Sequence, residues 1–379
     1  MNFAFTEEQE ELRETALAFL ADKANSEAVR AAMASENGWD DGLWAQLGSE
    51  LGWTAVHIPE EYGGLGLGYV EFVALLEIMG EHLVCSPYFA TLAFGANAIL
   101  VAGSEDQKQA LLPPIAEGEC TATLALTEPT GRWDAKGIEA TCTADGDDYV
   151  LSGTKRYVVD GDTAELLIIA ARAPGSEGEA GISLFAVPAD TEGIARKALP
   201  TVDQTRRQAE IKLSDVRVPA SARLGGEGAG WAHVAKTLDL AGVALAAEQV
   251  GGAQRCLDEA VAYANERVQF GRVIGSFQSI KHKCADMMVS VEAGRSAIYY
   301  AACVATEGTD ELPSVASLAQ VFCSEAYFQC AADSIQIHGG VGFTWEYDCH
   351  MHFKRAKSSE TLLGDPAYHR ELVAKRIGI

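Results

Sequence analysis

The chain has 379 residues, of which 48% are hydrophobic and 22% are charged. This composition supports large hydrophobic cores, excludes a disordered or collagen-like protein, and at this length suggests two or three domains. Because 29 basic residues face 54 acidic ones, the net charge is −25, and we expect no nucleic-acid partner.

The sequence shows no pattern typical of a signal peptide, a membrane span or a disulfide framework. The first residues lack the basic flank and apolar run of a signal peptide, and no stretch of ~18 apolar residues predicts a membrane span. The nine cysteines are scattered without a C-x-x-C pair. We therefore expect a cytoplasmic protein with reduced thiols, without a disulfide framework or a zinc site.

Residues 1–120 carry helical patterns. Thr6 and Gln9 have the spacing of a capping box, and apolar residues follow on one helical face. A second apolar helix is predicted over about residues 69–79. Pro113-Pro114 is predicted to break the helical pattern near the end of the region 1–120. The first domain is therefore predicted to be helical.

Residues 121–228 carry short β-prone runs separated by Gly, Asp and Pro, at 121–126, 147–153, 165–171, 182–187 and 209–213. This spacing predicts an antiparallel β domain. From residue 229 to residue 379, long amphipathic stretches at 232–268, 278–306 and 314–337, with a shorter one after Pro366, predict an antiparallel helical bundle. The predicted class is α+β with three domains, 1–120, 121–228 and 229–379.

Two familiar motifs are set aside. The run from Gly64 to Gly68 looks like a dinucleotide loop, but Tyr69 stands where the third glycine belongs and no strand precedes it, so a tight turn is preferred. His350 and His352 are two residues apart, which would point them to different faces of a helix. No metal site is predicted.

Two other segments suggest a ligand. Residues 266–272 end a helix, where Gly271 could serve as a C-cap; alternatively, Arg267 can bind phosphate and Phe270 can pack against a flat ring. Residues 336–343 combine Gln336 with bare glycines, which let a ligand approach backbone N–H groups.

Together, six segments in order resemble the acyl-CoA dehydrogenase family across essentially the whole chain: residues 59–66, 127–129, 153–155, 215–219, 267–271 with 277–278, and 336–343. The resemblance implies a helical N-terminal domain, a β middle domain and a C-terminal four-helix bundle, assembled as a dimer of dimers. It implies FAD as cofactor, an acyl-CoA substrate and electron-transfer flavoprotein as acceptor. In that chemistry a carboxylate removes the α-proton of the thioester while the flavin takes the β-hydride.

The family's FAD site is shared between two chains, one enclosing the flavin ring and its neighbour gripping the nucleotide end. The resemblance implies that the gripping residues are all present here: Arg267, Phe270, Phe277, Gln278, Gln336, Gly339 and Gly340. On the ring side it implies Thr127, Tyr157 and Val159. This half departs from the family, because Val159 replaces a hydroxyl residue and Trp133 replaces a small serine.

The catalytic base is also missing from its usual places, which align with Leu363 and Ala241. Losing the base should cost several orders of magnitude in rate. Glu248, two helical turns beyond Ala241, and Asp365 are the remaining candidates. Each also has an ordinary interpretation as a solvated or capping residue.

This asymmetry favours a supporting subunit of a heterotetramer, like those of bacterial steroid degradation, that grips the FAD of a catalytic partner. One alternative is a self-sufficient homo-oligomeric dehydrogenase that uses Glu248 or Asp365. Others are a flavin monooxygenase of the same fold and a non-enzymatic carrier of acyl-CoA or flavin. The sequence does not identify the acyl group.

Overall fold

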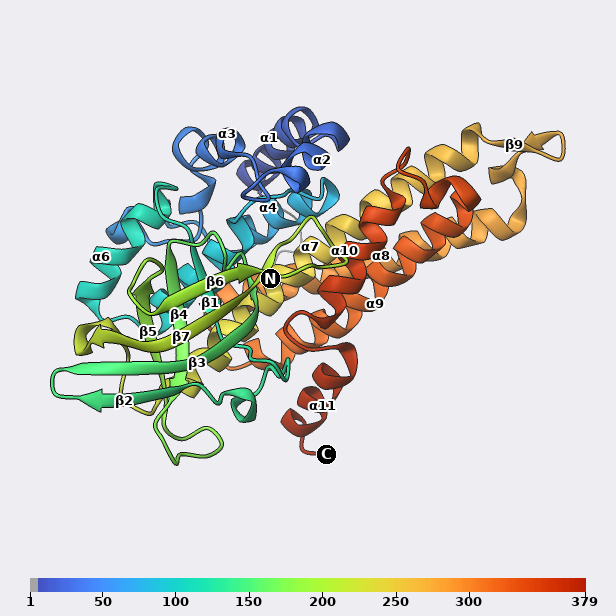
Figure 1. Ribbon diagram of the computed structural model, residues 1–379. Coiled ribbons are helices and arrows are strands. Elements are labelled where there is room, and N and C mark those ends of the chain that lie inside the picture. The colour runs from blue at the N-terminus through green and yellow to red at the C-terminus, as the bar shows by residue number, and fades with distance from the viewer. Residues whose placement is uncertain (1–5) are drawn as a thin grey trace. The chain divides into compact units, whose positions relative to one another are not determined.

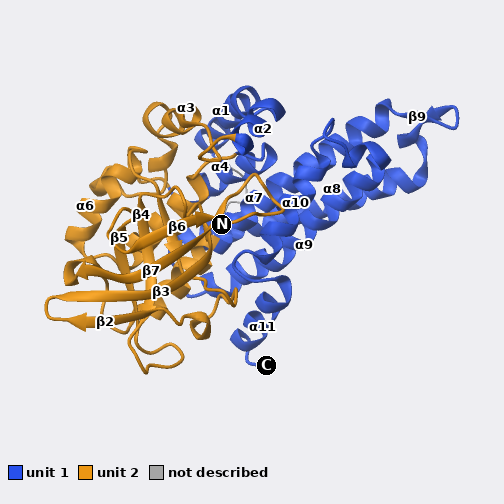
Figure 2. Cartoon of the chain, viewed as in Figure 1, with its two compact units in different colours: residues 1–34, 68–84, 242–379 blue, residues 35–67, 85–241 orange. Residues whose placement is uncertain are grey.

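The computed structural model describes residues 6–379, which form two compact units (Figures 1 and 2). The first unit contains the described residues up to Ala34 together with 68–84 and 242–379, and the second contains 35–67 and 85–241. The units cut across the three predicted domains, because helices from both ends of the chain belong to the first unit. The domain boundaries therefore stay a prediction. Within residues 6–379, every helix is too short or too polar to cross a bilayer.

The first unit is helical. Its elements are α1 (Glu7–Lys23), α2 (Ser26–Ala34), α4 (Tyr69–Glu81), most of α7 (Gly230–Glu266), α8 (Gln278–Glu307), α9 (Leu312–His338), α10 (Cys349–Thr361) and α11 (Pro366–Arg376). The predicted capping box at the start of α1 is confirmed. The Thr6 hydroxyl accepts the Gln9 N–H at 3.2 Å, and the Gln9 side chain accepts the Thr6 N–H at 3.0 Å.

Helix α10 was not predicted from the sequence. Its sequence is polar, so apolar periodicity does not reveal it, yet much of the helix is buried. His352 lies 3.0 Å from the Tyr327 hydroxyl through Nδ1, and Arg355 pairs with Glu248 of α7. Specific polar partners, rather than an apolar stripe, therefore place this helix in the bundle.

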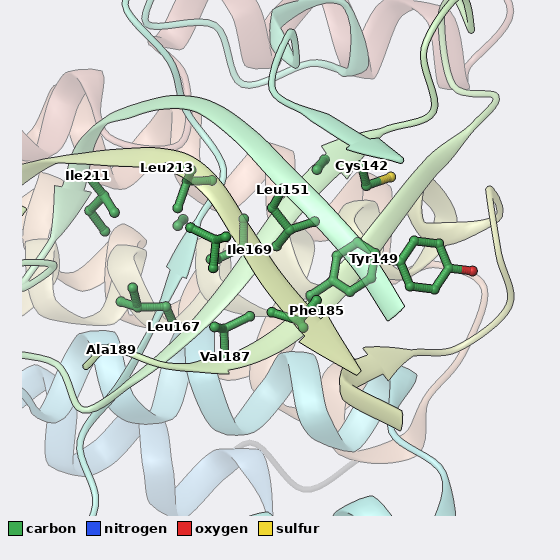
Figure 3. Close-up of a cluster of buried hydrophobic side chains, with 14 of the residues drawn as sticks. Cys142, Tyr149, Leu151, Leu167, Ile169, Phe185, Val187, Ala189, Ile211 and Leu213 are labelled. Carbon is green, nitrogen blue, oxygen red and sulfur yellow. The ribbon is translucent and has the colours of Figure 1, made fainter. Parts of the chain in front are cut away.

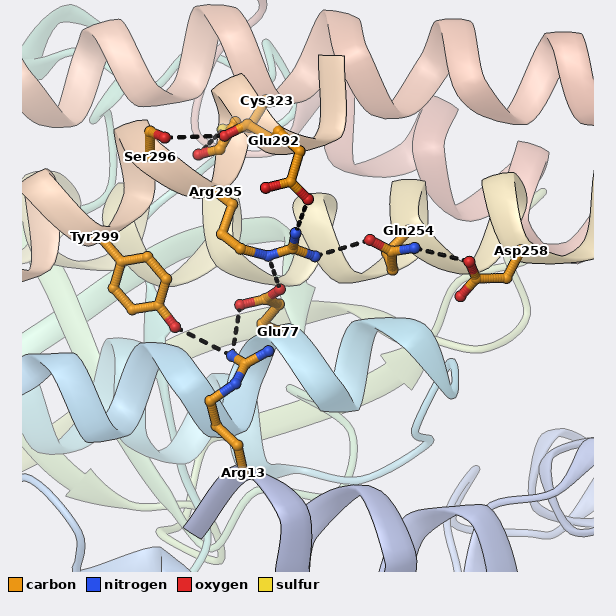
Figure 4. A network of polar contacts seen from close by, with 10 residues as sticks. Arg13, Glu77, Gln254, Asp258, Glu292, Arg295, Ser296, Tyr299 and Cys323 are labelled. Carbon is orange, nitrogen blue, oxygen red and sulfur yellow. Dashed lines mark hydrogen bonds and ion pairs between the residues drawn. The ribbon is translucent and has the colours of Figure 1, made fainter. Parts of the chain in front are cut away.

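A buried ion-pair network joins α1, α4 and α8 (Figure 4). Glu77 on α4 is fully buried and accepts hydrogen bonds from Arg13 at 2.9 Å and from Arg295 at 2.8 Å. Gln254 accepts from Arg295 at 2.8 Å, and the Tyr299 hydroxyl accepts from Arg13 at 3.1 Å. Because two cations neutralise one buried carboxylate, the network fixes α1 onto the helices of its own unit.

The second unit contains the start of α7, up to Ala241, and three helices that precede its sheet. They are α3 (Asp41–Ala45), α5 (Asn97–Ala102) and α6 (Glu105–Ala116), with π-helical turns at Gln46–Glu50 and Phe89–Ala96. The predicted break at Pro113-Pro114 falls later than expected, since both prolines lie inside the last turn of α6. Each proline removes one N–H donor from the helix, which ends at Ala116, and the proline carbonyls accept the N–H groups of Glu117 at 3.0 Å and Glu119 at 2.8 Å.

The strands of the second unit are β1 (Ala122–Ala125), β2 (Thr141–Asp145), β3 (Asp148–Val159), β4 (Leu166–Arg172), β5 (Ile182–Pro188), β6 (Ile194–Ala198), β7 (Gln208–Pro219) and β8 (Arg223–Leu224). They form one sheet in the order β6-β7-β3-β2-β4-β5-β8, with β1 paired to β4. Most pairs are antiparallel, as predicted. The prediction was incomplete, because β1–β4 and β2–β4 are parallel. Parallel β1 and β4 are possible because β2 and β3 lie in the long connection between them.

The sheet is held by a cluster of buried apolar side chains from β3, β4, β5 and β7 (Figure 3). Leu167 and Ile169 come from β4, Phe185 from β5 and Ile211 from β7. The rings of Tyr149 and Phe185 lie 5.2 Å apart. Burial of each large side chain contributes about 1.5–3 kcal/mol, so this core fixes the strands that carry the ring-side residues.

Candidate functional site

The hairpin that follows α7 carries the first group of predicted gripping residues (Figure 1). Strands β9 (Val268–Gln269) and β10 (Arg272–Val273) pair antiparallel, and Phe270 and Gly271 form the turn with φ of +54° and +78°. Positive φ at both turn residues is typical of a type I′ hairpin. Gly271 therefore serves the hairpin and is not the C-cap of α7. The Phe270 side chain is 92% exposed and meets the Phe277 ring edge-on at 6.1 Å.

Arg267 and Gln278 lie on either side of this hairpin. The Arg267 N–H donates to the Tyr263 carbonyl, and its own carbonyl accepts from Ile274 N–H, both at 2.8 Å. The backbone is thus fixed while the side chain is exposed, and it makes no ion pair within residues 6–379. Gln278 is the exposed first residue of α8. An exposed guanidinium with no carboxylate partner is suited to bind phosphate.

Gln336, Gly339 and Gly340 lie at the C-terminal end of α9. Gln336 is exposed, and Gly339 has a φ of +66° that favours glycine. A Cβ atom at Gly339 or Gly340 would meet no atom within 4 Å. Internal packing therefore leaves this space open to a molecule outside the chain. The Tyr263 and His338 rings stack at 4.4 Å, which places the end of α9 beside the end of α7.

The structure thus brings the predicted gripping residues to one end of the first unit, and their chemistry fits the nucleotide end of FAD. A guanidinium, two exposed amides, an exposed aromatic ring and open glycines can bind a diphosphate and a flat base. In a chain with a net charge of −25, an anion depends on such local groups. No cluster of His, Cys, Asp and Glu suited to a metal ion occurs in the described part of the chain.

The predicted ring-side residues lie in the second unit, where the segment after β1 crosses β3. The Thr127 hydroxyl donates to the Arg156 carbonyl at 2.6 Å, and the Arg156 N–H donates to the Thr127 carbonyl at 2.8 Å. Tyr157 has a φ of +61° at an irregularity in the β3–β7 pairing and is 37% exposed. Val159 is buried, and its carbonyl accepts the Thr123 hydroxyl at 2.7 Å. Val159 therefore offers no side-chain donor to a ligand.

The neighbouring motif residues Glu128 and Lys155 form a buried ion pair at 2.7 Å. Glu128 also accepts the N–H groups of Glu139 at 3.0 Å and Ala140 at 2.9 Å, and Lys155 donates to the Leu126 carbonyl at 3.1 Å. Burial lowers the pKa of Lys155, an effect that Glu128 opposes. Two of the segments that carry the family resemblance are therefore joined by a structural ion pair.

The usual base positions are apolar and buried in the structure. Ala241 is fully buried in α7, and Leu363 is 3% exposed with a φ of +68°. Trp133, which stands where the family has a small serine, is half-buried. None of these three side chains can take a proton from a thioester.

The two remaining carboxylates already have structural partners. Glu248 is buried in α7 and forms an ion pair with the buried Arg355 of α10. Asp365 is exposed and accepts the Tyr368 N–H at 2.7 Å, which caps α11. A catalytic role for Glu248 or Asp365 stays a prediction.

Three aromatic residues at the gripping end were not predicted from the sequence: Tyr263, His338 and Tyr347. Their rings contact one another although they belong to separate segments. One signal was available, because His338 directly precedes Gly339 within a segment already singled out.

Comparison with known proteins agrees with this architecture. Residues 6–119, 123–216 and 228–378 match the N-terminal, middle and C-terminal domains of acyl-CoA dehydrogenases. Acyl-CoA dehydrogenase IpdE2 of Mycolicibacterium smegmatis is 35% identical over 361 residues, covering 95% of this chain and 96% of the relative.

Two solved structures extend the comparison. Butyryl-CoA dehydrogenase from Megasphaera elsdenii superposes with a TM-score of 0.93 at 31% identity, covering 100% of both chains. The ChsE4-ChsE5 complex from Mycobacterium tuberculosis gives 0.90 at 27% identity, covering 100% of this chain and 99% of the matched chain. The predicted three-part fold is confirmed. This chain belongs to the acyl-CoA dehydrogenase family of FAD-dependent oxidoreductases.

Proposed function

We propose that this chain is the supporting subunit of a heterotetrameric acyl-CoA dehydrogenase of the bacterial steroid-degrading type. It takes part in α,β-dehydrogenation of an acyl-CoA thioester by gripping the nucleotide end of an FAD whose flavin ring lies in a catalytic partner chain. Electron-transfer flavoprotein is the proposed electron acceptor.

The observation that carries the proposal is the contrast between the two kinds of site residue. Arg267 and Gln336 are exposed, and Gly340 leaves open space beside its Cα atom. At the usual base positions, by contrast, Ala241 and Leu363 are buried and apolar. The chain therefore retains what is needed to bind a nucleotide and has no proton acceptor at either of the two usual base positions.

Four of the gripping residues have a defined task in this role. Arg267 neutralises the diphosphate, and Gly339 and Gly340 let it approach backbone N–H groups without meeting a side chain. Phe270 offers a flat apolar face to the adenine. FAD supplies the hydride acceptor when it is bound. These residues bind and orient the cofactor and move no proton themselves.

The comparisons support a mixed assembly. ChsE4-ChsE5 is a complex of two differently named chains, and one of them aligns with this chain over its whole length. The exposed apolar residues of the hairpin, Val268 at 54% and Phe270 at 92%, are consistent with contact to a second chain.

The test compares flavin content with and without the partner. We would purify this chain alone and together with the acyl-CoA dehydrogenase-like product of an adjacent gene, then measure FAD per chain by absorbance and turnover with acyl-CoA. Alone, the chain should hold little FAD and show no turnover. Together, FAD should follow the amount of partner. Full FAD occupancy with turnover by the isolated chain would exclude the supporting role and favour the self-sufficient alternative.

A further inference from the structure

The gripping end contains three rings in mutual contact, which we call the ring triad: Tyr263, His338 and Tyr347. The Tyr263 and His338 rings stack with centroids 4.4 Å apart and an interplanar angle of 26°. The Tyr347 ring meets both of them edge-on, at 5.9 Å from Tyr263 and 5.3 Å from His338. Both arrangements are favourable geometries for aromatic pairs. The triad therefore joins the end of α7, the end of α9 and the segment before α10.

Two members of the triad lie next to gripping residues. The carbonyl of Tyr263 accepts the N–H of Arg267 at 2.8 Å, so this ring lies one helical turn before the guanidinium. His338 is followed directly by Gly339 and Gly340. The stack of Tyr263 on His338 therefore links the two segments that must bind one diphosphate together.

The orientation of His338 is itself fixed. Its Nδ1 atom lies 2.8 Å from the carbonyl oxygen of Ser334, one turn earlier in α9. Since a carbonyl can only accept, Nδ1 carries the proton. The side chain is buried, and this burial lowers the pKa of His338, so the ring is neutral at neutral pH. Positive charge at this end therefore comes from the exposed side chains of Arg267 and Arg272 rather than from the triad.

The third ring is held from α2. Asp348, next to Tyr347, pairs with Arg30 and accepts the Ser26 hydroxyl at 2.8 Å. The Arg30 guanidinium also lies 5.2 Å from the ring centroid of Trp345. A helix near the start of the sequence thereby fixes the segment that supplies Tyr347.

We propose that the ring triad is a positioning device for the FAD grip, in which Tyr263 and His338 set the spacing between Arg267 and the Gly339-Gly340 turn. The triad acts through these neighbours and is not assigned a contact with FAD. Without the triad, the two exposed segments that carry Arg267 and the Gly339-Gly340 turn would have to become ordered when FAD binds. This ordering would lower the affinity for FAD. This inference rests on the proposed function.

The test uses apo-complex with the catalytic partner and measures FAD and FMN binding by flavin fluorescence. FMN lacks the adenylate half of FAD, so the grip contributes little to its affinity. Tyr263→Leu removes the stack on His338 and the edge-on contact with Tyr347. It should weaken FAD binding about tenfold while FMN affinity stays unchanged. Tyr263→Phe keeps the ring and should restore FAD affinity to within about twofold.

Two further variants keep the test decisive. Tyr347 is 36% exposed, so Tyr347→Leu leaves a smaller cavity and should give a smaller, equally FAD-selective loss of about threefold. Phe328→Leu is the matched control, because the rings of Phe328 on α9 and Phe353 on α10 lie 5.3 Å apart and neither belongs to a gripping segment. Phe328→Leu should leave FAD affinity unchanged.

The triad's role is overturned if Tyr263→Leu weakens FMN as much as FAD, or if Phe328→Leu matches it. It is also overturned, with the proposed function intact, if Arg267→Ala lowers FAD affinity and Tyr263→Leu does not. If neither Arg267→Ala nor Tyr263→Leu changes FAD affinity, the proposed function fails together with the triad.

Discussion

The gripping end of the first unit differs from the crossing in the second unit, where the segment after β1 meets β3. The two regions differ in whether their charged side chains have partners within the chain. At the crossing, Glu128 and Lys155 are buried and paired with each other at 2.7 Å. At the gripping end, Arg267 is exposed and has no carboxylate partner within residues 6–379. Residues that carry the family resemblance can therefore have either of two roles. Paired groups serve the fold, and exposed groups without a partner are available to a ligand.

The largest expected effect comes from removing the buried ion pair between Glu128 and Lys155. Lys155→Met should lower the free energy of unfolding by about 3–5 kcal/mol, because Glu128 would be left buried without a cation. Urea unfolding measures the change. The control is Arg217→Ala, which removes an exposed ion pair with Asp145 and should cost less than about 1 kcal/mol. Equal stability of Lys155→Met and the parent chain would show that the pair is not structural.

Mildly acidic pH should also destabilise the sheet-bearing second unit. Burial lowers the pKa of His57, in the sheet-bearing unit, from 6.5 to about 4, against a hydrogen bond to Asn97. Above pH 6.5 both folded and unfolded states are neutral at this residue. As the pH falls from 6.5 to about 4, the unfolded state takes up a proton that the folded state does not, which costs about 3 kcal/mol.

Urea unfolding at several pH values between 7.5 and 4.5 would measure that slope. His57→Gln retains a polar side chain but does not titrate, so its free energy of unfolding should fall less steeply with acid than that of the parent chain. Identical slopes for the two proteins would contradict a buried neutral His57.

The next largest effect is expected at the gripping end, where Arg267 is exposed. Arg267→Ala should weaken FAD binding to the complex about a hundredfold, or about 2.7 kcal/mol, because charge-assisted bonds to the diphosphate are lost. Its unfolding curve should not change, since the side chain has no carboxylate partner in the described chain. Arg370→Ala, which removes an exposed pair with Glu325, is the matched control and should bind FAD normally.

The smallest expected effect concerns Asp365. Asn caps a helix as well as Asp does, so Asp365→Asn should preserve α11 and, in a supporting subunit, leave turnover of the complex within about twofold. If Asp365 were the base, the rate would fall by about 10²–10⁴. Steady-state kinetics with acyl-CoA and an artificial electron acceptor distinguishes the two outcomes.

Local patterns predicted much of the fold. The capping box of α1 and the strands β3, β4, β5 and β7 follow from spacing and composition that neighbouring residues set by themselves. Helix α10 could not be predicted in this way, because its buried residues include His352 and Arg355, whose partners lie on other helices. The parallel position of β1 likewise depends on a strand about forty residues later.

The sequence predicted the gripping residues but not the side chains that hold them in place. The pattern of residues 267–278 and 336–340 is local and identifies Arg267 and Gly339 directly. The ring triad depends on contacts between Tyr263, His338 and Tyr347, which come from three segments, and no spacing in the sequence indicates that they meet. Long-range contacts of this kind need the folded structure.

The exposed turn of the β9–β10 hairpin has a consequence for the isolated chain in solution. Phe270, at 92% exposure, gives each such molecule an exposed apolar contact point. With a net charge of −25, such molecules repel one another and stay dispersed at low ionic strength. Salt screens this repulsion, so the isolated chain should aggregate as the salt concentration rises.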